Sequence, residues 1–116
     1  MPIYYFGHVR GMDINVTDNK LSTPLHWAAY SRSEVALKYI LSLNPNLEAR
    51  DSKGNTALHL AVKSVEQLKS TRPVRALLLK GSDREAQDNE GRKARSFISD
   101  NLPHPIKRDL KNILVS

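Results

Sequence analysis

The sequence predicts an all-α solenoid, in which short helix-turn-helix units stack side by side and finger loops join them. The first observation is a motif of Thr, Leu, His and Ala that occurs in residues 18–29 and again in residues 51–62, at an offset of 33. The second is an element that starts at Gly11, Asn44 and Gly81, at offsets of 33 and 37. Two elements in phase at one period indicate stacked repeats, since a single short unit cannot bury its own apolar faces.

The first complete unit begins at Thr23 and Pro24. A threonine hydroxyl accepts a hydrogen bond from a free N–H group of a helix's first turn, and a proline just after it loses no bond. Leu25, Ala28 and Ala29 then share one helical face, and the alanines allow a neighbouring helix to come close. We expect a second, more apolar helix that ends at Asn44-Pro45 and carries Val35, Leu37, Ile40 and Leu41.

The second unit is four residues longer, and the extra residues fall within 63–73. Val65 and Leu68 predict that its first helix continues for another turn. Thr71 and Pro73 suit the start of the next helix, which Gly81 ends. An insertion of this kind either decorates a binding face or merely lengthens a loop.

The third unit is degenerate, because Lys93, Arg95 and Ser96 occupy the slots of Thr, Leu and His. Polar residues are expected on the outer face of a terminal repeat, which has no further neighbour. A last helix is predicted over roughly residues 105–115, and its apolar stripe consists of Ile106, Leu110, Ile113 and Leu114. We expect that stripe to pack on the preceding repeat.

The Thr-Pro-Leu-His-x-Ala run and its phased partner resemble the ankyrin repeat, strongly over residues 11–91 and weakly at both ends. The resemblance implies an ankyrin-repeat solenoid whose units bind other proteins. We expect one domain over residues 1–116, with a partial N-terminal unit (1–17), a first repeat (18–50), a second repeat with an insertion (51–87) and a degenerate capping repeat (88–116). For the N-terminal edge we expect one of three arrangements: Tyr4, Tyr5 and Phe6 fold down as a cap, the chain is a piece of a longer protein, or a partner covers the edge.

His26 and His59 raise the question of a metal or acid–base site. They lie one repeat apart, and therefore roughly 10 Å from each other in a stack, which is too far to share a zinc ion. Because both occupy the same slot, we expect each to hydrogen-bond its capping threonine and the backbone of the neighbouring finger.

The composition narrows the class of protein. The 116 residues contain no cysteine, which excludes disulfides, thiol nucleophiles and cysteine-bound zinc. There is no apolar run of about 18 residues and no signal-peptide pattern, so we expect a cytoplasmic or nuclear protein. No catalytic or phosphate-binding motif occurs, and we expect a non-catalytic scaffold without a cofactor or metal.

The predicted function is protein–protein interaction through the finger loops and the concave face. Trp27 is the foremost candidate, since aromatic anchors carry much of the binding energy of an interface, although it could instead pack between units as Leu60 does. Lys20 and Lys53 suit an acidic or phosphorylated peptide. The full set of predicted contact residues is Asn19, Lys20, Ser22, Trp27, Tyr30, Ser31, Ser52, Lys53, Asn55, Lys63, Ser64, Asn89, Glu90 and Arg92.

Two alternatives remain open. The run from Thr23 to Tyr30 is similar to the ankyrin region of DHHC-type palmitoyltransferases, which implies a portion that recruits substrates for a catalytic part elsewhere. The net charge of +6 is concentrated after residue 50, which allows RNA or anionic lipid to bind. The cations that would bind RNA or anionic lipid are Arg92, Lys93, Arg95, Lys107, Arg108 and Lys111.

Overall fold

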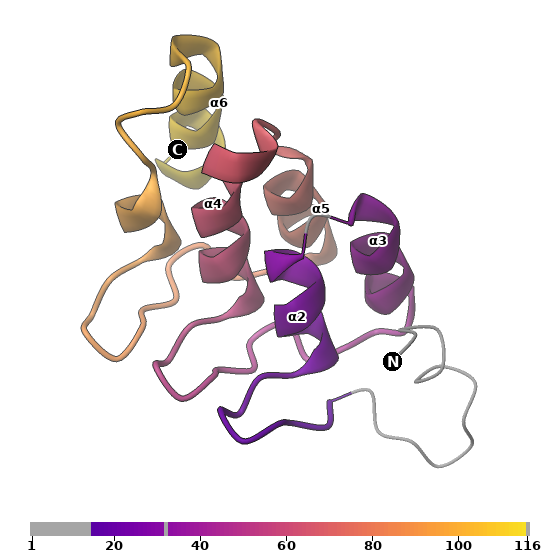
Figure 1. The fold of residues 1–116 in the computed structure, drawn as a ribbon. Coiled ribbons are helices and arrows are strands. Elements are labelled where there is room, and N and C mark those ends of the chain that lie inside the picture. The colour runs from indigo at the N-terminus through magenta and orange to yellow at the C-terminus, as the bar shows by residue number, and fades with distance from the viewer. Residues whose placement is uncertain (1–14, 32, 116) are drawn as a thin grey trace.

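The computed structural model describes residues 15–31 and 33–115, and the expectations for residues 1–14 lie outside that range. In those residues, every multi-residue element of secondary structure is a helix (Figure 1). They are α2 (Pro24–Tyr30), α3 (Glu34–Ser42), α4 (Ala57–Leu68), α5 (Arg72–Lys80), the 3₁₀ helix η1 (Ala94–Phe97) and α6 (His104–Val115). This confirms the predicted all-α repeat fold.

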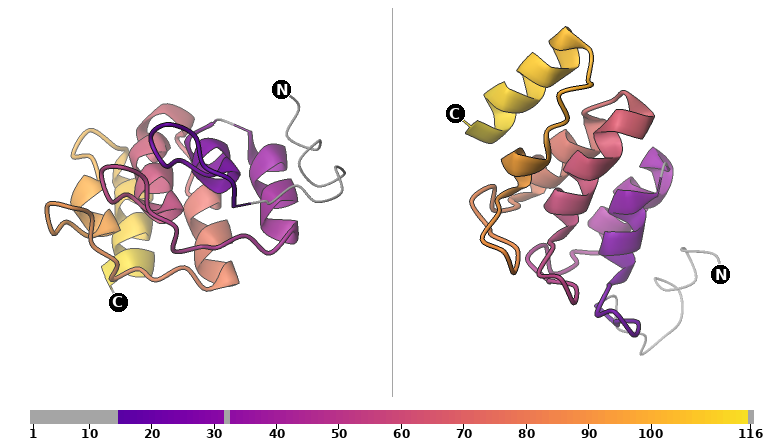
Figure 2. Two further views of the ribbon diagram at one scale, coloured as in Figure 1. Left: turned by 90° about the horizontal axis from the view of Figure 1, so that it is seen from below. Right: turned by 60° about the vertical axis from the view of Figure 1, so that its left-hand side comes forward.

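The helices form two rows. The inner row consists of α2, α4 and η1, which pack in that order, and α3 packs on α5 in the outer row. Three loops project from the same end of the stack, namely residues 15–22, 49–55 and 84–92, and they lie one beside the other in both further views (Figure 2). The concave side of the molecule is therefore lined by the inner helices and the finger loops.

The capping signals explain where the inner helices begin. Thr23 is the N-cap of α2, and its hydroxyl accepts a hydrogen bond from the N–H group of His26. Thr56 is the N-cap of α4 at the equivalent position. Leu25, Ala28 and Ala29 are buried as predicted, and so are Leu58, Ala61 and Val62 one unit later. The core thus repeats with the period of the sequence.

The second unit follows the prediction of a longer first helix. Helix α4 has 12 residues against 7 in α2, and its C-cap is Lys69, which adopts a left-handed conformation with φ of 55°. Thr71 precedes α5 as expected, but its hydroxyl donates to Asp109 Oδ2 at 3.0 Å instead of capping the helix. Thr71 therefore marks the start of α5, as predicted, but its side chain does not cap the helix.

The cap of the stack is the helix α6. Leu110 and Leu114 are fully buried, with Ile106 and Ile113 partly buried beside them, so the predicted stripe faces the preceding repeat. Its Asp109 accepts hydrogen bonds from Thr71 and Arg75, which ties the helix to the start of α5. Val35, in contrast, does not join the apolar face of α3 as expected: it is 79% exposed, whereas Leu37, Ile40 and Leu41 are buried.

Candidate functional site

The finger loops share one hydrogen-bond pattern that fixes their shape. In the first loop, Asp18 Oδ1 accepts from the backbone N–H groups of Lys20 and Ser22, both at 2.9 Å. Asp51 and Asp88 make the same two bonds in the second and third loops. These bonds hold the pKa of Asp18 and of Asp88 below its ordinary value, because they stabilise the ionised carboxylate.

The fingers are also tied to one another. The N–H group of Ser52 donates to the carbonyl of Lys20 at 2.8 Å, and that of Asn89 donates to the carbonyl of Lys53 at 3.1 Å. Gly54 lies where the second finger contacts the third, with φ of +80°, and an added Cβ would come within 2.5 Å of the backbone nitrogen of Asn89. The tips of the fingers therefore form a rigid row rather than separate loops.

The two motif histidines are structural, as predicted. His26 Nδ1 lies 2.9 Å from the hydroxyl of Thr23, and its Nε2 lies 2.8 Å from the carbonyl oxygen of Asn55 in the next finger. His59 repeats both contacts with Thr56 and with the carbonyl of Arg92, at 2.9 Å each. Both ring nitrogens are thus occupied. The pKa of His59 is lowered, chiefly because burial disfavours the charged ring. The hydrogen bond to the Arg92 carbonyl and the charge of Asp88 raise this pKa, but by less.

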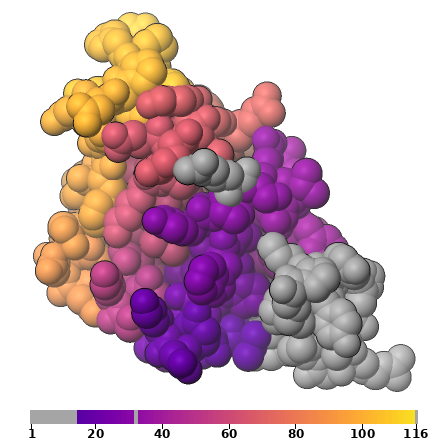
Figure 3. All heavy atoms as spheres, in the orientation of Figure 1, coloured from indigo at the N-terminus to yellow at the C-terminus, as the bar shows by residue number. Residues whose placement is uncertain are grey.

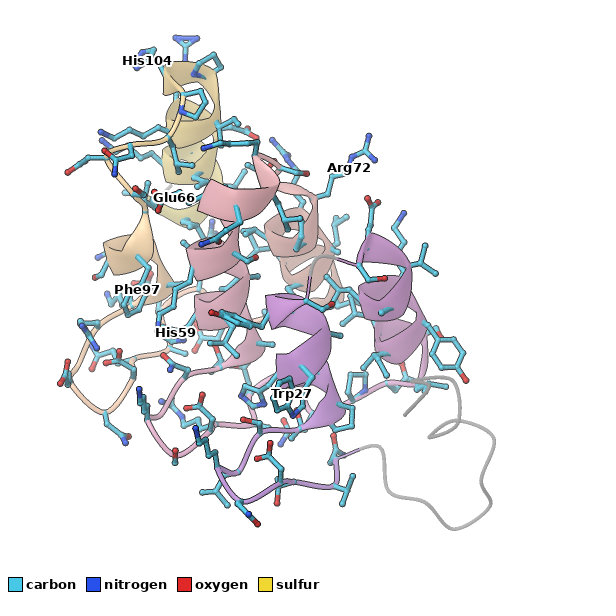
Figure 4. All side chains as sticks on the ribbon, viewed as in Figure 1. Trp27, His59, Glu66, Arg72, Phe97 and His104 are labelled. Carbon is cyan, nitrogen blue, oxygen red and sulfur yellow. The ribbon has the colours of Figure 1, made fainter. Side chains whose placement is uncertain are left out.

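An aromatic hollow lies on the concave side between the first two units. Trp27 is 59% exposed, and its indole Nε1 donates to Asp18 Oδ2 at 3.1 Å, so the ring is held in place on the surface (Figure 4). The hollow measures about 200 Å³ and is lined by Ser22, His26, Trp27, Tyr30, Asp51 and Leu60. The alternative in which Trp27 packs between units is therefore wrong.

A second aromatic cluster lies one unit further along. Phe97 of η1 and His59 form a T-shaped ring pair, with 5.9 Å between the ring centroids and 71° between the ring planes. The ammonium group of Lys63 lies 4.3 Å from the centroid of Phe97, and the guanidinium carbon of Arg92 lies at 5.0 Å. The pKa of Lys63 is lowered, chiefly by burial and then by the positive charge of Arg92.

Most of the predicted contact residues lie at the surface. Asn19, Lys20, Trp27, Tyr30, Ser52, Lys53, Asn89, Glu90 and Arg92 are exposed, while Ser22, Ser31 and Lys63 are half-buried. Two predictions are wrong. Asn55 is 4% exposed, because its backbone and amide bind Asp51 and its carbonyl accepts from His26, and Ser64 is 3% exposed, because its hydroxyl donates to the carbonyl of Ala61.

Sequence reasoning missed Phe97. The signal was present, since Phe97 lies 37 residues after Leu60, which itself lies 33 after Trp27, so the three occupy equivalent slots. The degenerate motif of the third unit concealed this relation.

The surfaces of successive units adjoin each other without a gap (Figure 3). None of the described helices is long and apolar enough to cross a bilayer. Across the part of the chain that the structure describes, no group of three or more His, Cys, Asp or Glu side chains is placed to hold a metal ion. A family model of ankyrin repeats, described as three copies, matches residues 4–88.

Proposed function

Because the chain belongs to the ankyrin-repeat family, whose members are generally protein-interaction modules, we propose that it binds a partner protein through its concave face, with Trp27 as the anchor. One observation carries this proposal. A large aromatic ring that is 59% exposed is held by Asp18 beside a hollow that Tyr30 and Leu60 also line. A surface that is already rigid binds with little loss of conformational entropy.

The proposal is specific about what enters the hollow. Trp27 and Tyr30 offer ring faces, and the carboxylate of Asp51 is the charged group in the lining. Lys20 and Lys53 lie on the exposed finger tips outside this lining. An apolar side chain of the partner fits this lining, since aromatic rings make the largest contribution where water is excluded.

The test compares two exposed residues on opposite sides of the molecule. Trp27→Ala removes the anchor, whereas Leu79→Ala trims a side chain of α5 that is 88% exposed and does not line the hollow. We expect pull-downs from lysate to lose a specific protein with the first variant and to retain it with the second. Circular dichroism must show both variants folded. Equal capture by the two variants would contradict the proposal.

The structure offers less support for RNA or anionic lipid as the ligand. Among the six cations considered for that role, Arg92 pairs with Asp88 and Glu90, Lys93 and Arg95 pair with Glu85, and Lys107 pairs with Asp100. Arg108 and Lys111 are left without such a carboxylate among the described residues. We therefore retain protein binding as the proposed function.

A further inference from the structure

The concave face changes its chemistry from one end to the other. At the first unit, the exposed rings of Trp27 and Tyr30 lie close to carboxylates, since Asp18 binds the indole and Asp51 lines the hollow. At the junction of the second and third units, the ring of Phe97 lies instead beneath the ammonium group of Lys63 and beside the guanidinium group of Arg92. The two ends of the face therefore favour different side chains.

Lys63 is the unusual member of the second cluster. Arg92 has its own counter-ions, because its guanidinium lies 3.1 Å from Asp88 Oδ2 and 2.7 Å from Glu90 Oε2. Among the residues that the structure describes, no carboxylate oxygen lies within 4.0 Å of the nitrogen of Lys63. This half-buried ammonium group lies over the ring face of Phe97 beside a second cation, and Asp51 and Asp88 attract it without forming an ion pair.

An anion bound between Lys63 and Arg92 would stabilise the cluster in two ways. It would give Lys63 a directly paired counter-charge, and it would offset the repulsion between Lys63 and Arg92. The lowered pKa of Lys63 agrees with this, since burial and the charge of Arg92 outweigh the opposing attraction of Asp51 and Asp88. A carboxylate there would make charge-assisted hydrogen bonds to both cations.

We propose that the cluster of Lys63, Phe97 and Arg92 receives an acidic side chain of the bound partner. The inference rests on the proposed function and adds to it the chemistry of the bound segment. The cluster lies roughly 10 to 15 Å from the aromatic hollow, if adjacent helices are about 10 Å apart. An extended chain covers that distance in about three to five residues. The preferred ligand is thus an extended segment with an apolar residue and, three to five residues away, an Asp or Glu.

The experiment uses the full 116-residue chain and a random 12-residue peptide library displayed on phage. We expect the selected peptides to be enriched in an acidic residue at the stated distance from an apolar one. The selected peptides are then synthesised, and Lys63→Glu should raise their Kd at least about tenfold. A selection repeated with this variant should enrich basic residues at the position where the wild-type chain selects acidic ones. The matched control is Lys111→Glu, an identical charge change on α6, which should change Kd less than about twofold.

Folding is checked for each variant by circular dichroism and thermal melting. If Lys63→Glu fails to fold, Lys63→Met keeps the apolar stem and removes the charge, and it should abolish the acidic preference while apolar selection persists. Peptides that require Trp27 but show no acidic enrichment would overturn this inference and leave the proposed function standing. Failure to select any peptide would overturn both. RNA binding that requires Lys63, without acidic peptides, would overturn the inference in favour of nucleic acid.

Discussion

His26 Nε2 lies 2.8 Å from the carbonyl oxygen of Asn55, so the side chain that helps to start α2 also holds the finger of the next unit. The same imidazole accepts at Nδ1 from the backbone N–H group of Thr23 at 3.0 Å. One residue thereby connects the N-cap of a helix, its first turn and the neighbouring repeat. His59 makes the equivalent connection to Arg92.

Replacing His26 with alanine should therefore destabilise the fold strongly. The change leaves the buried N–H group of Thr23 without its partner, and the carbonyl of Asn55 keeps only its bond from the N–H group of Asp51. We expect a loss of about 2 to 4 kcal/mol in the free energy of unfolding, measured by urea denaturation. Tyr30→Ala, an exposed change on the same helix, should alter it by less than about 0.5 kcal/mol. Equal losses in the two variants would contradict the structural role.

The stability should also depend on pH through His59. Its folded-state pKa lies below the ordinary value of 6.5, because burial disfavours the charged ring. The unfolded chain therefore takes up this proton more readily, so the stabilisation is complete above about pH 6.5 and is lost as the pH falls below it. We expect the urea concentration at the unfolding midpoint to decrease as the pH is lowered from about 7 to about 5. In His59→Gln, which cannot titrate, that part of the slope should disappear.

The left-handed positions of the fingers predict opposite effects of two substitutions. Leu21, Gly54 and Gly91 occupy equivalent places, all with positive φ, but only Leu21 carries a Cβ that disfavours this conformation. Leu21→Gly should raise the free energy of unfolding by up to about 1 kcal/mol, since the side chain is half exposed. Gly54→Ala should lower it by more than about 1 kcal/mol because its Cβ meets Asn89. Thermal melting of the two variants distinguishes the signs.

The cap should depend on Leu110, which is fully buried under the third unit. Leu110→Ala removes one methine and two methyl groups from the core, and we expect it to lower the free energy of unfolding by about 2 to 5 kcal/mol. Hydrogen exchange should then show faster exchange in α6 and η1 than in α2 and α3, because each repeat contacts only its neighbours. Uniform loss of protection across all helices would show that the stack unfolds as one unit.

The fold was predictable from sequence because its signals are local. Thr23, Pro24 and Thr56 mark helix starts by their own chemistry, and Gly81 marks an end, so the helix positions follow without knowledge of the neighbours. The length of α4 also followed from the apolar positions Val65 and Leu68. Periodicity alone did not orient Val35, whose exposure depends on which face of α3 meets α5.

The site was harder to predict, because exposure in a finger depends on the finger beside it. Asn55 looks like Ser22 in the sequence, but its amide turns inward to Asp51. Lys63 was expected as a contact residue, yet its position over Phe97 could not be inferred until the third unit was aligned with the first two. For a side chain that contacts the next repeat, the sequence period predicts its position within the repeat, but only the structure identifies the residue that it contacts.

The bonds from each histidine to the following finger run in one direction along the chain. His26 precedes its acceptor by 29 residues, and His59 precedes its own by 33. Since a ribosome releases the chain from its N-terminus, each imidazole emerges well before the carbonyl that it needs. During synthesis, a unit consequently cannot complete this hydrogen bond until its successor has left the exit tunnel.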